Sequence, residues 1–350
     1  MDTEVIKITE SNLSDSVSEL VRAADVIKSG GLVVFPTETV YGLGADATNP
    51  EAARKTYEAK GRPSDNPLII HVAKASDAEK YAYTTDLYYR LANRFMPGPL
   101  TVILKAKETV PLATRGGLDT VAVRCPSNKI ANKLIELSGV AVSAPSANIS
   151  GSPSATNASH VIDDMMGRVE MIIDGGDCDF GLESTIVKID GESSVTLLRP
   201  GKITVSELSE VAREVKVADA VTGELKEGEV ALSPGMKYKH YAPKSDVILL
   251  DADTSSVIEY IKNSNKGKIA LISYHEDVEI LKNSLPEAFI YDFGNKSDEI
   301  GQAHELFFIL RDIDKKSFDT VYAPLPKKEG ISLAIYNRIV RAAAHKIIKL

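Results

Sequence analysis

The chain has 350 residues, which is too long for one ordinary compact core. Of these residues 43% are hydrophobic and 26% are charged, a composition typical of a globular protein. Its formal net charge of −8 argues against phosphate-backbone binding by the whole surface, and its 6% aromatic content, without tryptophan, offers little for stacking on RNA bases. The acidic start MDTEVIKITE and the lack of any long apolar run lead us to expect no signal peptide and no membrane span. Cys125 and Cys178 are the only cysteines and lie far apart, which favours a reduced, cytoplasmic setting.

Strand-like runs and helical stretches alternate over the first part of the chain, which predicts an α/β domain over residues 1–212. Apolar residues at helical spacing predict helices at Leu13–Lys28, Glu51–Glu58, Thr85–Phe95 and Lys129–Leu137. Runs rich in Val, Ile and Leu predict strands at Gly31–Phe35, Pro67–Val72, Leu100–Leu104, Thr120–Arg124, Val140–Ser143, Met171–Asp174, Ser184–Ile189 and Val195–Arg199.

Regularity fades from about Glu214 to Lys244, and we assign residues 213–244 to a linker. The segment GELKEGEVALSPGMKYKHYAPKS contains Gly, Pro and mixed charge, as linkers do. It also places two tyrosines beside a histidine, at Tyr238, His240 and Tyr241. An ordinary exposed loop and a segment that docks onto another surface both remain open on this pattern.

Beyond residue 245 the order becomes strand, helix, strand, helix, which predicts a small Rossmann-like parallel α/β domain over 245–350. The predicted strands are Asp246–Leu250, Lys268–Ser273, Ala288–Asp292 and Thr320–Ala323. The predicted helices are Thr254–Asn263, Val278–Ser284, Glu299–Ile313 and Ile331–Lys346. No GxGxxG sequence accompanies them, so this fold does not by itself imply a dinucleotide.

Several common catalytic motifs are missing from the sequence. There is no GxxxxGK[ST] phosphate loop, no HExxH and no GxSxG nucleophile elbow, and GLGADA at Gly42–Ala47 lacks the third glycine of a dinucleotide fingerprint. The six histidines are scattered, and neither cysteine stands in a recognisable catalytic context. Covalent catalysis and a transition-metal cage therefore have little support.

Cationic and hydroxyl residues instead gather at predicted strand ends. Lys60 and Arg62 form a K-x-R pair, Arg124 and Arg199 each end a strand, and SAPSANISG at Ser143–Gly151 follows another. Ligands of open α/β sheets bind beyond strand ends, and guanidinium groups suit phosphate oxygens, so the pattern indicates a nucleotide polyphosphate pocket. Non-functional explanations of the same residues stay open at this point: a solvated basic loop, surface ion pairs and a polar turn.

Seven short motifs occur in one order over about residues 15–210: FPTETVYGLG, KGRPSDNPLIIHV, PGPLTVIL, VAVRCP, SAPSANISG, ESTIV and LLRPG. Together they resemble the YrdC-type domain of the threonylcarbamoyl-AMP synthase family. SPGMKYKHYAP and GISLAIYNRIVRAA are similar to the long, two-domain form. The resemblance implies a YrdC-type twisted mixed sheet with helices, followed by the smaller Rossmann-like domain. It also implies formation of L-threonylcarbamoyl-AMP and diphosphate from L-threonine, bicarbonate (or CO2) and ATP.

The resemblance also implies which residues form the site. Lys60 and Arg62 are implied as the catalytic cations. The residues implied for threonine are Thr39, His71, Arg124, Ala144 and Ser184. The residues implied for ATP are Arg62, Asn66, Thr120, Ser146, Asn148, Ser154, Arg199 and Tyr241. No protein ligands are implied for the Mg²⁺ that would accompany ATP, and Tyr241 would act as part of a lid over the nucleotide.

The implied product is the carbamoyl donor for N6-threonylcarbamoyladenosine in tRNA (t6A), which a separate tRNA threonylcarbamoyl transferase complex would complete. Direct binding of tRNA by this chain is left open. The carbamoyl-adenylate chemistry of hydrogenase-maturation carbamoyltransferases is the nearest enzymatic alternative, although those proteins have zinc-binding cysteine motifs that are missing here. A non-catalytic RNA-binding module is the alternative from another class.

Overall fold

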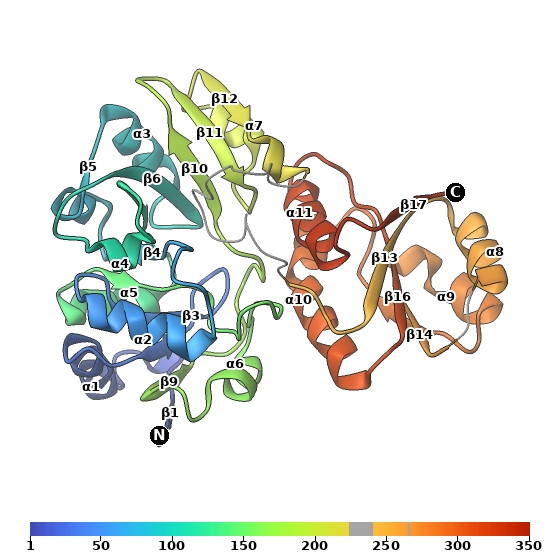
Figure 1. Ribbon diagram of the computed structural model, residues 1–350, viewed down its shortest axis with the longest axis horizontal. Helices are drawn as coiled ribbons and strands as arrows, with labels where there is room; N and C mark the ends of the chain where they lie inside the picture. The colour runs from blue at the N-terminus through green and yellow to red at the C-terminus, as the bar shows by residue number, and fades with distance from the viewer. Residues whose placement is uncertain (224–240, 265–266) are drawn as a thin grey trace. The chain divides into compact units, whose positions relative to one another are not determined.

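The computed structural model describes residues 1–223, 241–264 and 267–350 (Figure 1). The chain divides into two compact units. The first comprises Met1–Ser150 and Ser154–Lys237, and the second comprises Gly151–Pro153 and Tyr238–Leu350. Within the described residues, every helix is too short or too polar to cross a membrane.

The first unit is built on one large mixed sheet with the strand order β1-β9-β2-β3-β8-β4-β7-β6-β10-β11-β12, with β5 paired to β6. Two parallel pairs at the β1 end are followed by three antiparallel pairs from β2 to β4, and the pairs alternate from there to β12. The predicted twisted mixed sheet is confirmed. In chain order the strands are β1 Glu4–Lys7, β2 Val33–Phe35, β3 Gly42–Asp46, β4 Ile69–His71, β5 Ala82–Tyr83, β6 Leu100–Ala106, β7 Thr120–Arg124, β8 Val142–Ser143, β9 Met171–Asp174, β10 Thr185–Ile189, β11 Ser194–Arg199 and β12 Glu214–Val217.

Helices cover the sheet of this unit, and burial on both faces explains why the sequence of strand β2 is continuously apolar. Val33 and Phe35 join one core cluster with α1 and α5, while Val34 joins a second cluster on the opposite face. A strand buried on both faces needs no polar alternation. The helices are α1 Val17–Lys28, α2 Pro50–Lys60, α3 Asp86–Phe95, α4 Leu112–Arg115, α5 Lys129–Ser138, α6 Ala158–Met165 and α7 Val205–Ser209, with 3-10 turns η1 Glu10–Asn12, η2 Ala75–Lys80 and η3 Asp219–Val221.

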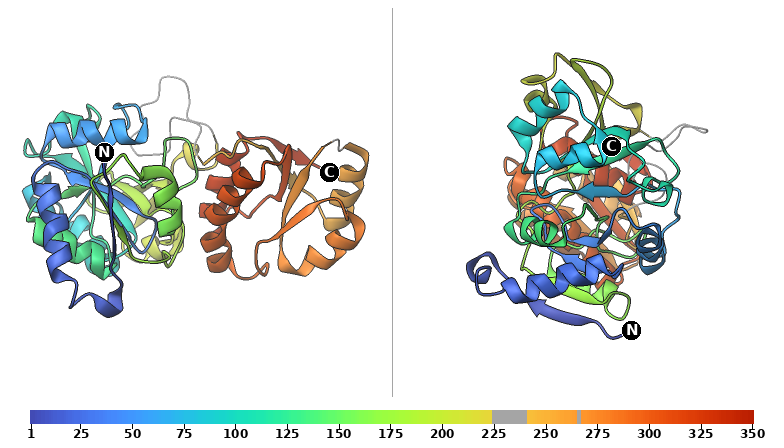
Figure 2. Two further views of the ribbon diagram at one scale, coloured as in Figure 1. Left: turned by 90° about the horizontal axis from the view of Figure 1, so that it is seen from below. Right: turned by 90° about the vertical axis from the view of Figure 1, so that its left-hand side faces the viewer.

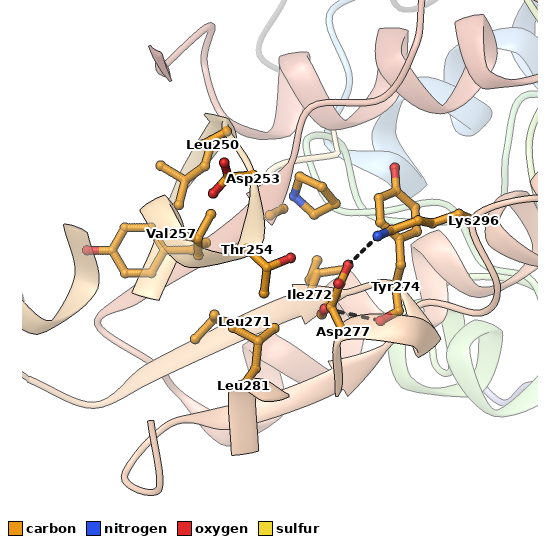
Figure 3. A pocket seen from close by; sticks show the side chains of 15 residues that line it. Leu250, Asp253, Thr254, Val257, Leu271, Ile272, Tyr274, Asp277, Leu281 and Lys296 are labelled. Carbon is orange, nitrogen blue, oxygen red and sulfur yellow. Dashed lines mark hydrogen bonds and ion pairs between the residues drawn. The ribbon is translucent and has the colours of Figure 1, made fainter. Parts of the chain in front are cut away.

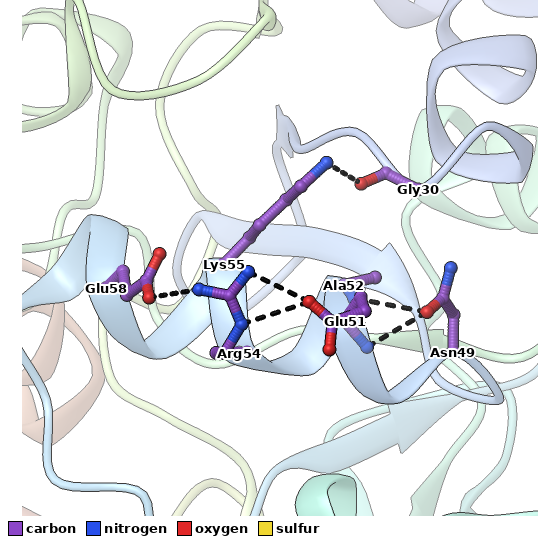
Figure 4. A network of polar contacts seen from close by, with 7 residues as sticks. All are labelled: Gly30, Asn49, Glu51, Ala52, Arg54, Lys55 and Glu58. Atoms are coloured by element: carbon purple, nitrogen blue, oxygen red, sulfur yellow. Dashed lines mark hydrogen bonds and ion pairs between the residues drawn. The ribbon is translucent and has the colours of Figure 1, made fainter.

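Helix α2 is held by contacts at its start and along its length (Figure 4), and a glycine ends it. The Asn49 side chain accepts hydrogen bonds from the amides of Glu51 and Ala52, at 2.9 and 3.4 Å, and caps the start. Lys55 donates to the carbonyl of Gly30 at 2.7 Å and ties the helix to the loop before β2. A left-handed glycine directly after Lys60, with φ of 60°, ends the helix. The result is a helix that presents Lys60 at a defined place.

Four strands of the first unit were not expected from the sequence: β1, β3, β5 and β12. Gly42–Asp46, considered above only as an incomplete fingerprint, forms β3, and a Cβ on Gly44 would lie 2.7 Å from the Phe35 ring. Close packing of that ring on the backbone therefore requires glycine. Glu214–Val217, assigned above to the linker, forms the edge strand β12 beside β11. Its short polar alternation, EVKV, gave too weak a signal against the irregular sequence that follows.

The second unit contains five parallel strands in the order β15-β14-β16-β13-β17. They are β13 Asp246–Asp251, β14 Ile269–Ser273, β15 Phe289–Asp292, β16 Thr320–Pro324 and β17 Ile347–Lys349. The helices are α8 Thr254–Ser264, α9 His275–Ser284, α10 Glu299–Lys316 and α11 Ser332–Ala342. Figure 2 shows α8 and α9 on one face of this sheet and α10 and α11 on the other. The predicted Rossmann-like parallel domain is confirmed.

The last element of the second unit differs from the prediction. The helix expected over Ile331–Lys346 ends at Ala342, and the strand β17 follows it. Ala344 and His345 have φ values of 46° and 61°, which are incompatible with a continuing right-handed helix. The chain turns there to pair Ile347 with Leu249 of β13. Burial against this neighbouring strand outweighs the local helical pattern.

Candidate active site

Residues from four separate strands form one polar row across the sheet of the first unit. His71 of β4 is in register with Arg124 of β7, which is in register with Thr101 of β6. Thr101 is in register with Ile186 of β10, and Ile186 with Arg199 of β11. Side chains at paired positions of neighbouring strands share a face, so the predicted residues His71, Arg124 and Arg199 lie along one line.

Arg124 and Glu38 form a buried ion pair at this row. Their side chains are 5% and 9% exposed, and Arg124 Nη2 lies 2.8 Å from Glu38 Oε1. Despite that distance the two groups are not aligned for a hydrogen bond, and neither Glu38 oxygen has a hydrogen-bond partner among the described residues. Arg124 Nε and Nη2 are likewise buried without one. Unsatisfied buried charges of this kind favour a ligand that supplies the missing contacts.

His71 lies beside Arg124 and is neutral at physiological pH. Burial, assisted by the nearby Arg124 charge, lowers the pKa of His71 to about 3. Its Nδ1 is buried and has no hydrogen-bond partner among the described residues. The ring therefore contributes a dipole and a shape to the site, and not a charge.

A tight turn before β3 holds Glu38 in place. Thr37 Oγ1 donates to the carbonyl of Val40 at 2.6 Å and lies 2.9 Å from Thr39 Oγ1. The carbonyls of Glu38 and Thr39 accept hydrogen bonds from Phe180 and Gly181, respectively, at 2.9 and 3.1 Å. The turn is thereby tied to the segment that leads into β10. The predicted threonine-site residue Thr39 is itself fully buried.

Ser184 and Arg199 form the other end of the row. Arg199 donates through Nε to the Ser184 carbonyl at 3.0 Å and through Nη2 to the Ser184 hydroxyl at 3.1 Å. The same hydroxyl lies 2.8 Å from Thr101 Oγ1. The preceding residue, Glu183, accepts a hydrogen bond from Ser154 at 2.5 Å. Predicted residues from both substrate groups thus meet here: Ser184 for threonine, and Ser154 and Arg199 for ATP.

Lys60 connects helix α2 to the SAPSANISG loop. Its Nζ donates to the carbonyls of Ser146 and Asn148, and the Lys60 side chain is 2% exposed. Ser146 Oγ donates to Asn148 Oδ1 at 2.6 Å. The amide of Ala144 donates to the carbonyl of Ile69 at 2.9 Å, which joins this loop to β4. The lysine of the predicted K-x-R pair therefore contacts the predicted S-x-N loop, and its ammonium group is buried there.

Arg62, Asn66 and Thr120 occupy the approach to β4 and β7. Arg62 Nη2 donates to the carbonyls of Asn66 and Pro67, each at 3.2 Å. Asn66 is 2% exposed, and its Oδ1 is buried without a hydrogen-bond partner among the described residues. Thr120 begins β7 and is partly exposed. It stands four residues before Arg124 on the same face of that strand.

Tyr241, the remaining predicted ATP residue, lies in the second unit. Its ring is buried and stacks on Phe307 with 5.1 Å between the centroids, and its φ is 63°. Residues 224–240, which include Tyr238 and His240 of the predicted lid, lie outside the described residues. The lid remains a prediction.

Neither cysteine is suited to nucleophilic catalysis. Burial raises the pKa of the Cys125 thiol to about 11 and raises that of Cys178 further above its ordinary value. Over the described part of the chain, no group of three or more His, Cys, Asp or Glu residues is placed to hold a metal ion. The described side chains of the site offer hydrogen bonds and cations.

The second unit has a cavity of about 210 Å³ at the carboxyl ends of β13, β14 and β16 (Figure 3). Helices α9 and α11, which follow the adjacent strands β14 and β16, lie on opposite faces, so the cavity is at the switch point of the sheet. Its floor is aliphatic, and Lys296 pairs with Asp277 at 2.7 Å on its rim. Asp253 caps α8 with a carboxylate where a phosphate would bind in a dinucleotide site. This lining disfavours a dinucleotide.

Three residues of the row and its surroundings were missed at the sequence level: Glu38, Thr101 and Glu183. Each is buried and contacts a predicted site residue. Glu38 was missed because an acid in a turn is ordinarily solvated, and its neighbours in the sequence do not show that it is buried. Thr101 carried no signal, since threonine is common in strands.

The comparisons with known proteins agree with this geometry. Residues 25–201 match the Sua5/YciO/YrdC family model, described as "Telomere recombination", and residues 203–344 match the model described as the C-terminal domain of threonylcarbamoyl-AMP synthase. The threonylcarbamoyl-AMP synthase of Pyrococcus abyssi is 43% identical over 338 residues, covering 94% of this chain and 95% of that protein. The enzyme of that name from Bacillus subtilis is 36% identical, covering 96% of each.

A solved structure is similar over the whole chain. The crystal structure of P. abyssi Sua5 complexed with L-threonine has a TM-score of 0.88 and 38% sequence identity, and the match covers 100% of both chains. The resemblance inferred from the seven motifs is therefore confirmed. The chain belongs to the threonylcarbamoyl-AMP synthase family, in its two-domain Sua5 form.

Proposed function

We propose that this chain makes L-threonylcarbamoyl-AMP and diphosphate from L-threonine, bicarbonate (or CO2) and ATP, for synthesis of t6A in tRNA. The observation that carries the proposal is the buried polar row of the first unit, in which Arg124 stands between His71 and the Ser184–Arg199 end. The family relationship and the L-threonine complex of P. abyssi Sua5 support it. Two arginines on one sheet face suit a reaction between two anions.

The threonine end is assigned to Arg124 and its neighbours. The guanidinium of Arg124 binds the substrate carboxylate, to which it offers a planar fork of donors. Neutral His71 lies next to it and adds no competing charge. Thr39, Ala144 and Ser184 complete this end with hydroxyl and main-chain groups.

The nucleotide end is assigned to cations and neutral donors. Lys60, Arg62 and Arg199 face the phosphates, where their charges offset the triphosphate. The neutral groups assigned to ATP are those of Asn66, Thr120, Ser146, Asn148, Ser154 and Tyr241. Mg²⁺ is bound by the phosphate oxygens in this proposal and contributes charge neutralisation there.

The mechanism needs orientation and charge stabilisation, and no covalent enzyme intermediate. The threonine ammonium loses one proton, and the resulting amine adds to CO2 with loss of a second proton to form a carbamate. The carbamate oxygen attacks the α-phosphorus of ATP and displaces diphosphate. Both reactants are anions, so Lys60 and Arg62 lower their mutual repulsion. Holding them in line supplies up to about 7–11 kcal/mol of the acceleration. Lys60 is suited to this because its helix and its two carbonyl contacts fix its position.

The test is to incubate the full chain with the three substrates and Mg²⁺ and to measure the adenylate by mass spectrometry. We expect threonylcarbamoyl-AMP and diphosphate only when threonine, bicarbonate and ATP are all present. Formation of a carbamoyl-adenylate from carbamoyl phosphate and ATP, without threonine, would instead favour the hydrogenase-maturation chemistry. A chain that binds ATP but releases no diphosphate with any of these substrates would refute the proposal. The tRNA threonylcarbamoyl transferase complex is the proposed consumer of the product.

A further inference from the structure

Glu38 is a buried anion at the place assigned to threonine, and no role has yet been given to it. We propose that the Glu38 carboxylate binds the α-ammonium group of the amino-acid substrate while Arg124 binds its carboxylate. This inference rests on the proposed function, because it concerns the same substrate. It makes the Glu38–Arg124 pair a receptor for a zwitterion.

The geometry of the pair matches that of an α-amino acid. Arg124 Nη2 and Glu38 Oε1 are 2.8 Å apart. In an α-amino acid the ammonium nitrogen and the nearer carboxylate oxygen are separated by roughly 3 Å, as the N–Cα, Cα–C and C–O bond lengths require. A zwitterion lying antiparallel to the pair would therefore place each of its charges against the opposite charge of the protein.

Hydrogen bonding at the pair is incomplete in a way that such a ligand would correct. Both Glu38 oxygens are acceptors without a hydrogen-bond partner among the described residues, and Arg124 Nε and Nη2 are donors without one. An ammonium group supplies three N–H donors and a carboxylate supplies two acceptor oxygens. An ion pair that served only to support the fold would be expected to align its own hydrogen bonds, because burial makes unmet ones costly.

The surroundings of Glu38 keep its carboxylate in position for this role. Its own carbonyl accepts a hydrogen bond from Phe180, and the threonines on either side contact each other through their hydroxyl groups. The turn therefore does not depend on the Glu38 side chain for its shape. Replacing Glu38 with glutamine, which has nearly the same size, removes the charge while these backbone contacts remain.

The experiment compares two ligands by isothermal titration calorimetry, with the full chain and without ATP. L-Threonine carries both charges, whereas (R)-3-hydroxybutyrate keeps the carboxylate and hydroxyl but has hydrogen in place of the ammonium. In the wild type we expect threonine to bind more tightly. In Glu38→Gln we expect threonine affinity to fall at least tenfold and hydroxybutyrate affinity not to fall. Glu38→Asp, which keeps the charge, should keep the preference for threonine, and Glu19→Gln, on helix α1, should change the affinity for neither ligand.

Equal losses for both ligands in Glu38→Gln would show that Glu38 acts only through Arg124, and would overturn the inference. Unchanged threonine affinity in that variant would overturn it as well. Equal affinity of the wild type for the two ligands would do so without any variant, should the substituted chains fail to fold. A wild type that neither binds nor consumes threonine would instead refute the proposed function itself.

Discussion

Substituting Arg124 with methionine should destabilise the first unit strongly, because it leaves the Glu38 carboxylate buried without its counter-ion. The two side chains are 5% and 9% exposed, so water would screen the remaining charge poorly. Removal of one partner from a buried pair costs about 3–5 kcal/mol of unfolding free energy. The exposed pair formed by Arg22 and Glu4, with 53% and 49% exposure, provides the matched control, and Arg22→Met should cost at most about 1 kcal/mol.

Urea unfolding followed by circular dichroism gives the measurement, provided that the slope with urea is unchanged between variants. The double variant Glu38→Gln/Arg124→Met should recover most of the loss, because no uncompensated charge remains in it. Threonine binding should stay lost in the double variant, which separates stability from function. If Arg124→Met costs no more than Arg22→Met, or if the double variant is as unstable as Arg124→Met, the reasoning about the buried pair is wrong.

Three further predictions concern other residues of the first unit. The pKa of His71 is about 3 in the folded state and 6.5 in the unfolded state, so the unfolded state binds more protons between these pH values, and the free energy of unfolding should fall with falling pH, by about 2 kcal/mol at pH 5. Urea unfolding at several pH values measures this, and a His71→Asn variant with the same pH dependence as the wild type would contradict it. Lys60→Met should lower turnover, measured by diphosphate release, at least about a hundredfold. Lys55→Met, on the same helix but hydrogen-bonded to Gly30, should not lower it, and equal losses in the two variants would argue against a specific role of Lys60. Gly201→Ala would place a Cβ 2.5 Å from a backbone nitrogen at the start of β10 and should raise the KM for threonine, with Gly191→Ala, where the nearest atom is 3.5 Å away, as the control that should behave like the wild type.

The regular elements could be predicted largely from local sequence, and the errors have identifiable causes. The run GLVVF predicted a strand because it is apolar throughout, and β2 is indeed buried on both faces. Helix α2 was predicted from spacing, and its end after Lys60 follows from the left-handed glycine. Strand β12 was missed because four residues at a polar edge carry little signal, and β17 because the helical pattern before it continued past the true end.

The candidate site was predictable in its residue types but not in its pairings. Arg124 and Arg199 were chosen as cations at strand ends, and the motifs they belong to identified the family. Glu38 was not chosen, because an acid in a turn is ordinarily solvated and nothing local shows that this one is buried. Its importance depends on where Arg124 lies, 86 residues further along the chain.

The sequence by itself determined the alternation of strands and helices and the set of cationic and hydroxyl groups at strand ends. Only the tertiary structure decided that β4, β7, β6, β10 and β11 would be neighbours in register, and thus that His71, Arg124, Thr101 and Arg199 would form one row. The physical reason is that apolar periodicity is a local property, whereas strand order and register follow from burying all faces of the sheet at once. The opposite charges of Arg124, on β7, and Glu38, in the turn before β3, meet only in the folded chain.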